Sequence, residues 1–186
     1  VVSNEKVEQD PEEWWKLSRQ VIREVVDSLG NKADTIKYIT VTTSASCLVA
    51  VDDRGRSLRN SILVSDTRAV SQSRMLERTV EFQRVKAETG LKSSPDLMLP
   101  KIMWLAEHEP ETFQKSAYFV NVGDFLIARL TGLYVTDPNS ALKFHYLVSQ
   151  KRYPEDLIES LGLNPAQLPE VREMGSDLGT VLASVA

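Results

Sequence analysis

Hydrophobic residues recur with helical spacing near the start of the chain, between residues 11 and 29. The positions that define this pattern are Trp14, Leu17, Val21, Ile22, Val25 and Leu29. Asp10 can cap the helix, Pro11 suits its first turn, and Gly30 is typical of a helix end. The pattern therefore predicts a helix over residues 11–29 whose apolar face, including Trp14, lies in the core.

Further along, short apolar runs alternate with longer stretches of helical spacing. Alternating or β-branched runs predict strands at residues 36–42, 47–51, 62–64 and 117–122. Helical spacing predicts helices at residues 67–88, 101–109, 124–131 and 154–161. Strands separated by helices favour an α/β domain, in which a mixed sheet carries flanking helices on its faces.

The composition fits one soluble domain. The 186 residues are 42% hydrophobic, which is enough to bury one sizeable core. Acidic residues outnumber basic ones by 26 to 22, so the net charge of -4 provides no basic field for nucleic acid or anionic lipid. Cys47 is the single cysteine, and no apolar run approaches the roughly 20 residues that cross a bilayer. We expect a soluble cytoplasmic protein that binds neither nucleic acid nor membrane.

The residues themselves offer little candidate chemistry. The 8 glycines are scattered singly, so no glycine-rich phosphate cradle can be drawn, and no cysteine and histidine cluster has metal-site spacing. His108 and His145 lie far apart without a nucleophile motif, and we expect both on the surface. Asp66 follows a predicted strand, where it is equally suited to bind a ligand or to cap the next helix. Asp137, which precedes a proline, is expected mainly to cap.

Several segments in order resemble the FGGY family of carbohydrate kinases, most closely its xylulokinase branch. They are residues 7–15 (VEQDPEEWW), 39–52 (ITVTTSASCLVAVD), 62–68 (ILVSDTR), 100–108 (PKIMWLAEH), 130–132 (LTG) and 136–137 (TD). Each motif alone is weak, and their shared order and spacing carry the resemblance. It implies a ribonuclease H-like fold of the actin/hexokinase ATPase type, of which residues 1–186 form an incomplete N-terminal, sugar-binding domain.

The resemblance implies a sugar contact at Asp66, and by position alone at Ala45 and Ser46. Two departures from the family pattern affect this pocket. Residues 44–47 (SASC) replace Gln-Met-His-Gly, and Val64 stands where a tryptophan follows Ile-Leu. The smaller side chains imply a differently shaped sugar pocket, so the substrate is not taken to be xylulose.

The resemblance also implies parts that this chain does not supply. Family members open with an Asp-x-Gly-Thr phosphate hairpin, carry their catalytic aspartate in a later Gly-x-x-Asp segment, and bind adenine in a C-terminal ATPase domain. The implied function is ATP- and Mg²⁺-dependent phosphorylation of a ketose or polyol by the intact protein. We expect this chain alone to be inactive, with no catalytic residue or metal ligand of its own. A homodimer is compatible with the resemblance. The alternative is a non-catalytic sugar-binding or interaction module on the same scaffold.

Overall fold

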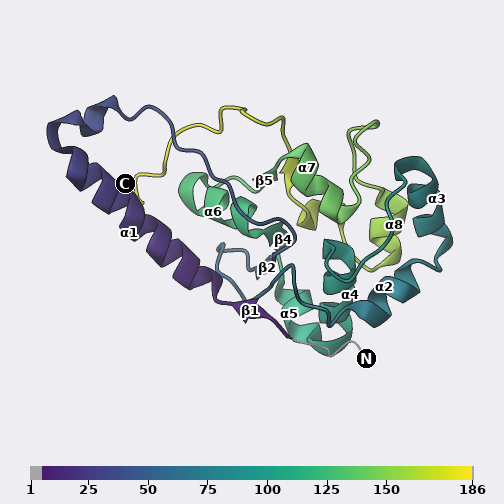
Figure 1. Ribbon diagram of the computed structural model, residues 1–186. Coiled ribbons are helices and arrows are strands. Elements are labelled where there is room, and N and C mark those ends of the chain that lie inside the picture. Colours follow the sequence, from purple (N-terminus) through teal and green to yellow (C-terminus); the bar gives the residue numbers. More distant parts are fainter. Residues whose placement is uncertain (1–5, 186) are drawn as a thin grey trace.

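The computed structural model describes residues 6–185, which fold around a small central sheet (Figure 1). The strands of the chain are β1 (Glu8–Gln9), β2 (Leu48–Val51), β3 (Ser61–Ile62), β4 (Tyr118–Asn121), β5 (Val135–Thr136) and β6 (Glu170–Val171). Its α-helices are α1 (Pro11–Leu29), α2 (Val70–Leu76), α3 (Val80–Thr89), α4 (Met98–His108), α5 (Pro110–Lys115), α6 (Val122–Thr131), α7 (Pro138–Ala141) and α8 (Glu155–Ser160). The predicted α/β architecture is confirmed.

The central sheet has the strand order β1-β3-β2-β4, and each of its pairings is antiparallel. The parallel pairing described in this chain lies in a separate two-stranded sheet, β5 with β6. The mixture of strand directions is therefore divided between two sheets. Within the central sheet, Leu48 at the start of β2 lies opposite both Ile62 of β3 and Asn121 at the end of β4. These three strand ends consequently meet at one edge.

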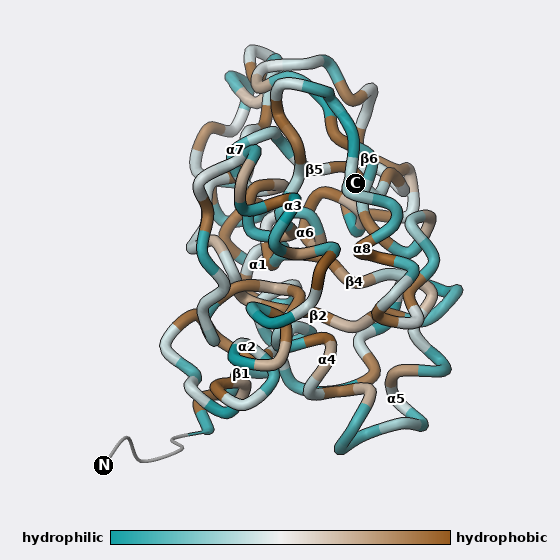
Figure 2. The backbone as a smooth tube through the Cα atoms, turned by 90° about the vertical axis from the view of Figure 1, so that its right-hand side faces the viewer, coloured by the Kyte–Doolittle hydropathy of each residue, from teal (hydrophilic) through white to brown (hydrophobic). Residues whose placement is uncertain are grey.

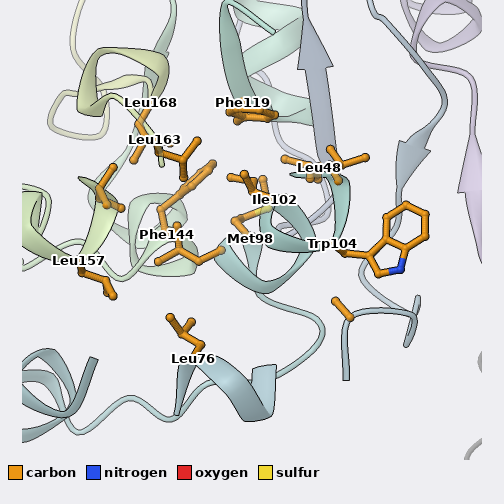
Figure 3. Packing of buried hydrophobic residues seen from close by; sticks show 14 of the residues in the cluster. Leu48, Leu76, Met98, Ile102, Trp104, Phe119, Phe144, Leu157, Leu163 and Leu168 are labelled. Carbon is orange, nitrogen blue, oxygen red and sulfur yellow. The ribbon is translucent and has the colours of Figure 1, made fainter. Parts of the chain in front are cut away.

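Alternation along β2 divides the core into two clusters, because successive side chains of a strand point to opposite faces. Leu48 and Ala50 pack with residues of α2, α3, α4 and α8, whereas Val49 and Val51 pack on the side of α1 and α6. Figure 1 shows α1 on one side of the sheet and the other helix group opposite. Figure 3 shows the larger cluster, in which Met98 and Ile102 of α4 lie between Leu48, Phe119 and Phe144. In Figure 2 hydrophobic stretches, in brown, alternate with hydrophilic ones, in teal, along the backbone.

The predicted helix over residues 67–88 is in fact two helices, α2 and α3. Thr79 has extended backbone angles and its side chain accepts a hydrogen bond from the N–H of Phe82, so it caps α3 and separates it from α2. The helix predicted at residues 101–109 begins earlier, at Met98, and Pro100 is tolerated because it lies in the first turn. Pro110 both ends this segment and opens α5.

The strand predicted over residues 36–42 is absent from the structure. Ile36 has extended backbone angles, but residues 37–45 take part in no backbone–backbone hydrogen bond described for this chain. Tyr38 is 87% exposed and Ile39 is also exposed. A strand requires a hydrogen-bonded neighbour, and no neighbouring strand lies beside this segment within residues 6–185. The β-branched pattern alone therefore gives an extended segment without a ladder.

The apolar face of α1 is only partly buried. Asp10 caps the helix by accepting a hydrogen bond from the N–H of Glu12, as predicted. Trp15 is buried against the sheet, and Trp14 is half-buried and packs against the same cluster, so Trp14 lies at the margin of the core. The remaining apolar stripe stays exposed at Leu17, Val21 and Val25. Helical spacing correctly identified the apolar stripe of α1. The stripe is wider than the area of α1 that the other described residues cover.

The two histidines differ. His108 is exposed, as predicted, and stacks on the ring of Trp104 with centroids 4.6 Å apart. His145 was expected on the surface, and this is wrong, because its side chain is fully buried and meets Phe82 edge-on at 5.1 Å. Within residues 6–185, no helix combines the length and the apolar character of a membrane span.

Candidate functional site

The candidate site lies at the sheet edge where β2 begins and β3 ends. The antiparallel register sets Leu48 opposite Ile62, so the turn before β2 and the loop after β3 are neighbours. We call residues 44–47 the β2 turn and residues 63–68 the β3 loop. The three residues predicted from sequence as sugar contacts lie on these two segments, Ala45 and Ser46 on the β2 turn and Asp66 on the β3 loop. The structure therefore brings them to the same edge.

Ser46 has an unusual backbone for a residue with a side chain. Its φ angle is 63°, in the left-handed region, and the residue is buried. This conformation costs about 1–2 kcal/mol for a residue other than glycine, so neighbouring groups must hold it. The N–H of Ser46 donates to Oδ1 of Asn121 at 2.8 Å, and its carbonyl accepts from Nζ of Lys101 at 2.6 Å. Ala45 beside it is half-buried and Ser44 is exposed.

Lys101 was not identified from sequence as a functional residue. It lies in α4, its side chain is fully buried, and its ammonium group also donates to the carbonyl of Leu63 at 2.8 Å. Burial lowers the pKa of Lys101 to about 8, because removal from water disfavours the charged form. A signal was present in the sequence, since Lys101 is the only charged residue in the otherwise apolar run 97–105.

Asp66 is buried, and the carboxylate is already bonded within the protein. Its Oδ1 accepts from the backbone N–H and Nε of Arg68, each at 2.9 Å, and its Oδ2 accepts from Nη2 of Arg68 at 2.7 Å and from the N–H of Val7 at 2.6 Å. Burial alone would raise the pKa of Asp66, but these hydrogen bonds outweigh it, so the pKa lies below its usual value. Asp66 is not the cap residue of α2, which is Ala69.

Arg68 extends this pair into a network that joins three elements. Its Nη1 lies 2.6 Å from Oε1 of Glu8 in β1, and its guanidinium lies over the ring of Trp104 in α4 at 4.7 Å. Arg59 contacts the same Glu8 and also Glu109, the latter at 2.8 Å. The network fixes the β3 loop against β1 and α4, because each charge in it has an oppositely charged partner.

Asn121 and Asp124 form the second support of the β2 turn and were also missed as site residues. They form a capping box at the start of α6, in which the N–H of Asn121 donates to Oδ2 of Asp124 at 3.0 Å. Asp124 is buried, and burial raises its pKa to about 7. The capping-box spacing Asn-x-x-Asp was visible in the sequence, but the use of the Asn121 amide oxygen by Ser46 depends on tertiary structure. Asp137 caps α7, as predicted.

Within residues 6–185, neither a metal cluster nor either of the two described grooves lies at this edge. Residues 6–185 contain no group of three or more histidine, cysteine, aspartate or glutamate side chains placed to hold a metal ion. A groove of about 490 Å³ runs along α1 and is lined in part by Trp15, Arg19 and Arg129, and none of the β2 turn or β3 loop contributes to it. At this edge Ser44 is exposed and Ala45 is half-buried, whereas Ser46 is buried with its backbone N–H and carbonyl bonded to Asn121 and Lys101.

The sequence pattern of the N-terminal domain of the FGGY family of carbohydrate kinases matches residues 2–186. The chain belongs to this family. It is 31% identical over 183 residues to the xylulose kinase of Bacillus subtilis (strain 168), a match that covers 96% of this chain and 36% of the relative. It is 30% identical over 186 residues to the glycerol kinase of Marinomonas sp. (strain MWYL1), covering 96% of this chain and 38% of the relative. This FGGY chain thus spans little more than a third of these relatives.

The crystal structure of xylulose kinase from Rhodospirillum rubrum has a similar fold. The TM-score is 0.89 with 29% identity, and the match covers 100% of this chain and 39% of that one. The likeness confirms the predicted fold class, an N-terminal domain of the actin/hexokinase ATPase type. Because xylulose and glycerol kinases are similar to this chain to about the same degree, the comparisons favour no single substrate.

Proposed function

We propose that the intact protein transfers a phosphoryl group from ATP to a hydroxyl of a small sugar or polyol. In this proposal residues 1–186 contribute part of one N-terminal, sugar-binding domain, and the remaining protein supplies an ATPase domain. The observation that carries it is the match of residues 2–186 to the FGGY N-terminal domain. The xylulose and glycerol kinases among its relatives support a substrate class of ketoses and polyols.

The β2 turn is the part of this chain that we propose to contact the sugar, through Ala45 and Ser46. Its fixed backbone favours this role, because a preorganised site loses less entropy when a ligand binds. Direct contact by Asp66 stays a prediction. Both oxygens of Asp66 already accept hydrogen bonds from Arg68 and the backbone, which favours a supporting role in which Asp66 holds the β3 loop beside the sugar.

ATP and Mg²⁺ are proposed to bind outside residues 6–185. These residues include no acidic cluster suited to a metal ion, and the glycines of the sequence form no phosphate cradle. When bound, Mg²⁺ would offset the charge of the transferred phosphoryl group. The contribution of this chain is to bind and orient the sugar hydroxyl, which raises the rate by positioning rather than by proton transfer.

A turnover assay with a substrate panel tests this proposal. The intact protein, given ATP, Mg²⁺ and a panel of ketoses and polyols, is expected to release ADP in a sugar-dependent manner. The smaller residues of the β2 turn and Val64 are proposed to change the shape of the sugar site in the intact protein, and small changes of shape alter selectivity about 10–200-fold. We therefore expect kcat/KM for D-xylulose to be at least about ten-fold below that of the best substrate.

The controls separate the kinase from its alternative. The isolated 186-residue chain is expected to release no ADP above the sugar-free rate. Sugar binding by the intact protein without ADP release would contradict the kinase proposal and favour a non-catalytic sugar-binding module. A clear preference for D-xylulose would contradict only the substrate expectation.

A further inference from the structure

Lys101 places a buried positive charge between two backbone segments of the candidate site. Its side chain is fully buried in α4. The ammonium group donates to the carbonyl of Ser46 in the β2 turn at 2.6 Å and to that of Leu63 in the β3 loop at 2.8 Å. The ammonium group thus joins the β2 turn, which precedes β2, to the β3 loop, which follows β3.

The hydrogen-bond partners of Lys101 do not explain why a charged side chain, rather than an apolar one, is buried here for stability. Among the ion pairs described for residues 6–185, none involves Lys101, so backbone carbonyls compensate its charge. Removing an ammonium group from water carries a large desolvation cost, which an apolar side chain of similar length would avoid. What the apolar side chain could not provide is a fixed distance between the two carbonyls.

The held segments are those that carry the candidate sugar contacts. Ser46 has a left-handed backbone, and Lys101 and Asn121 hold it from two different elements. The carbonyl of Leu63 also accepts the N–H of Asp66 at 3.1 Å. The ammonium group of Lys101 is therefore one of the contacts that set the position of the β2 turn relative to Asp66.

We propose that Lys101 is a positioning residue for sugar recognition, which fixes the β2 turn against the β3 loop without contacting the sugar. This rests on the proposed function for its link to the sugar. Loss of the ammonium group should release the turn and lower the affinity for the sugar. The step that follows bound substrate should be little affected, because the residue touches no reacting atom.

Cys47 is a built-in reporter for the first part of the proposal. It is the single cysteine of the sequence, it is buried, and it follows Ser46 directly. In the 186-residue chain, Lys101→Met is expected to speed labelling of the Cys47 thiol by a neutral alkylating reagent at least about ten-fold, because buried groups react through local opening. Lys86→Met, which removes the ion pair between Lys86 of α3 and Glu77 at the end of α2, is the half-buried control and should leave the rate unchanged.

Leu105→Ala is the control for global destabilisation. It opens a cavity in the buried core on the same helix, α4, but removes none of the hydrogen bonds that hold the β2 turn. Labelling is followed at increasing urea concentrations, so that variants are compared at equal free energy of unfolding. If Lys101→Met does not fold, Lys101→Gln, which keeps a neutral donor, is compared in the same way. Equal labelling of the Lys101 and Leu105 variants at matched stability would overturn the proposal.

The intact kinase tests the link to the sugar. Lys101→Met is expected to raise KM for the best sugar at least about ten-fold, while kcat and KM for ATP stay within about three-fold. Faster labelling with an unchanged sugar KM would overturn the assignment to sugar recognition. If the unmodified intact protein shows no sugar-dependent turnover, the proposed function and this link fail together, and the labelling experiment still decides whether Lys101 holds the turn.

Discussion

Arg68→Met is expected to lower the free energy of unfolding of the chain by about 3–5 kcal/mol at pH 7, because it leaves the Asp66 carboxylate buried without its cation. The side chains of Arg68 and Asp66 are 2% and 0% exposed, so water cannot replace the lost partner. Methionine fills much of the same volume against Trp104 but donates no hydrogen bond. Urea denaturation of the variant and the parent measures the difference.

Arg56 provides the matched control for this variant. It also binds an aspartate through its guanidinium, with Nη2 2.8 Å from Asp52, but its side chain is 64% exposed. Arg56→Met is therefore expected to cost no more than about 1 kcal/mol. The double variant Asp66→Asn, Arg68→Met should lose less than the sum of the two single variants, because it removes the unpaired charge. Similar losses for Arg68→Met and Arg56→Met would show that the Asp66–Arg68 pair does not hold the β3 loop.

The second large effect concerns pH, where two buried groups act in opposite directions. Burial lowers the pKa of His145 to about 4, so between pH 4 and 6.5 the unfolded chain binds more protons, and this group makes stability rise with pH. Burial raises the pKa of Asp124 to about 7, so between pH 3.8 and 7 the folded chain binds more protons, and this group makes stability fall with pH. We expect their contributions to offset each other between pH 4 and 6.5.

Single substitutions should reveal how each group alone changes the free energy of unfolding with pH. Without His145, as in His145→Gln, the free energy of unfolding should fall by about 3 kcal/mol relative to the parent's profile as pH rises from 4 to 6.5. Asp124→Asn keeps an amide oxygen for the N–H of Asn121, and its profile should rise by a similar amount over that range. Denaturation at half-unit pH intervals measures both profiles. Parallel profiles for the parent and both variants would contradict the buried, shifted state of these two groups.

Much of the fold could be predicted because local signals and tertiary structure agreed. Asp10 and Pro11 at the start of α1, and the buried apolar run of β2, needed no long-range information. The predictions from sequence were wrong where the structure of a segment depended on residues distant in sequence. Residues 36–42 have strand composition but no neighbouring strand within the described chain, and His145 carries a polar ring into the core because tertiary packing, not residue type, decides burial.

The candidate site was only partly predictable for the same reason. Its location at a strand end was visible, and Asp66, Ala45 and Ser46 do lie on adjoining segments of one edge. The groups that hold those segments, Lys101 and Asn121, act across 55 and 75 positions of sequence, and no local pattern specifies such contacts. Their chemistry became apparent only from burial and from the backbone atoms that they bind.

Hydrogen exchange of the intact kinase, followed by mass spectrometry with and without its best sugar, tests most directly whether the β2 turn binds the substrate. Sugar is expected to slow exchange at least about ten-fold in peptides that cover residues 44–47 and 63–68, because binding orders these segments further. Peptides from α3 (Val80–Thr89) should be unchanged. Sugar-dependent turnover without any protection of residues 44–47 would contradict the claim that this turn binds the substrate.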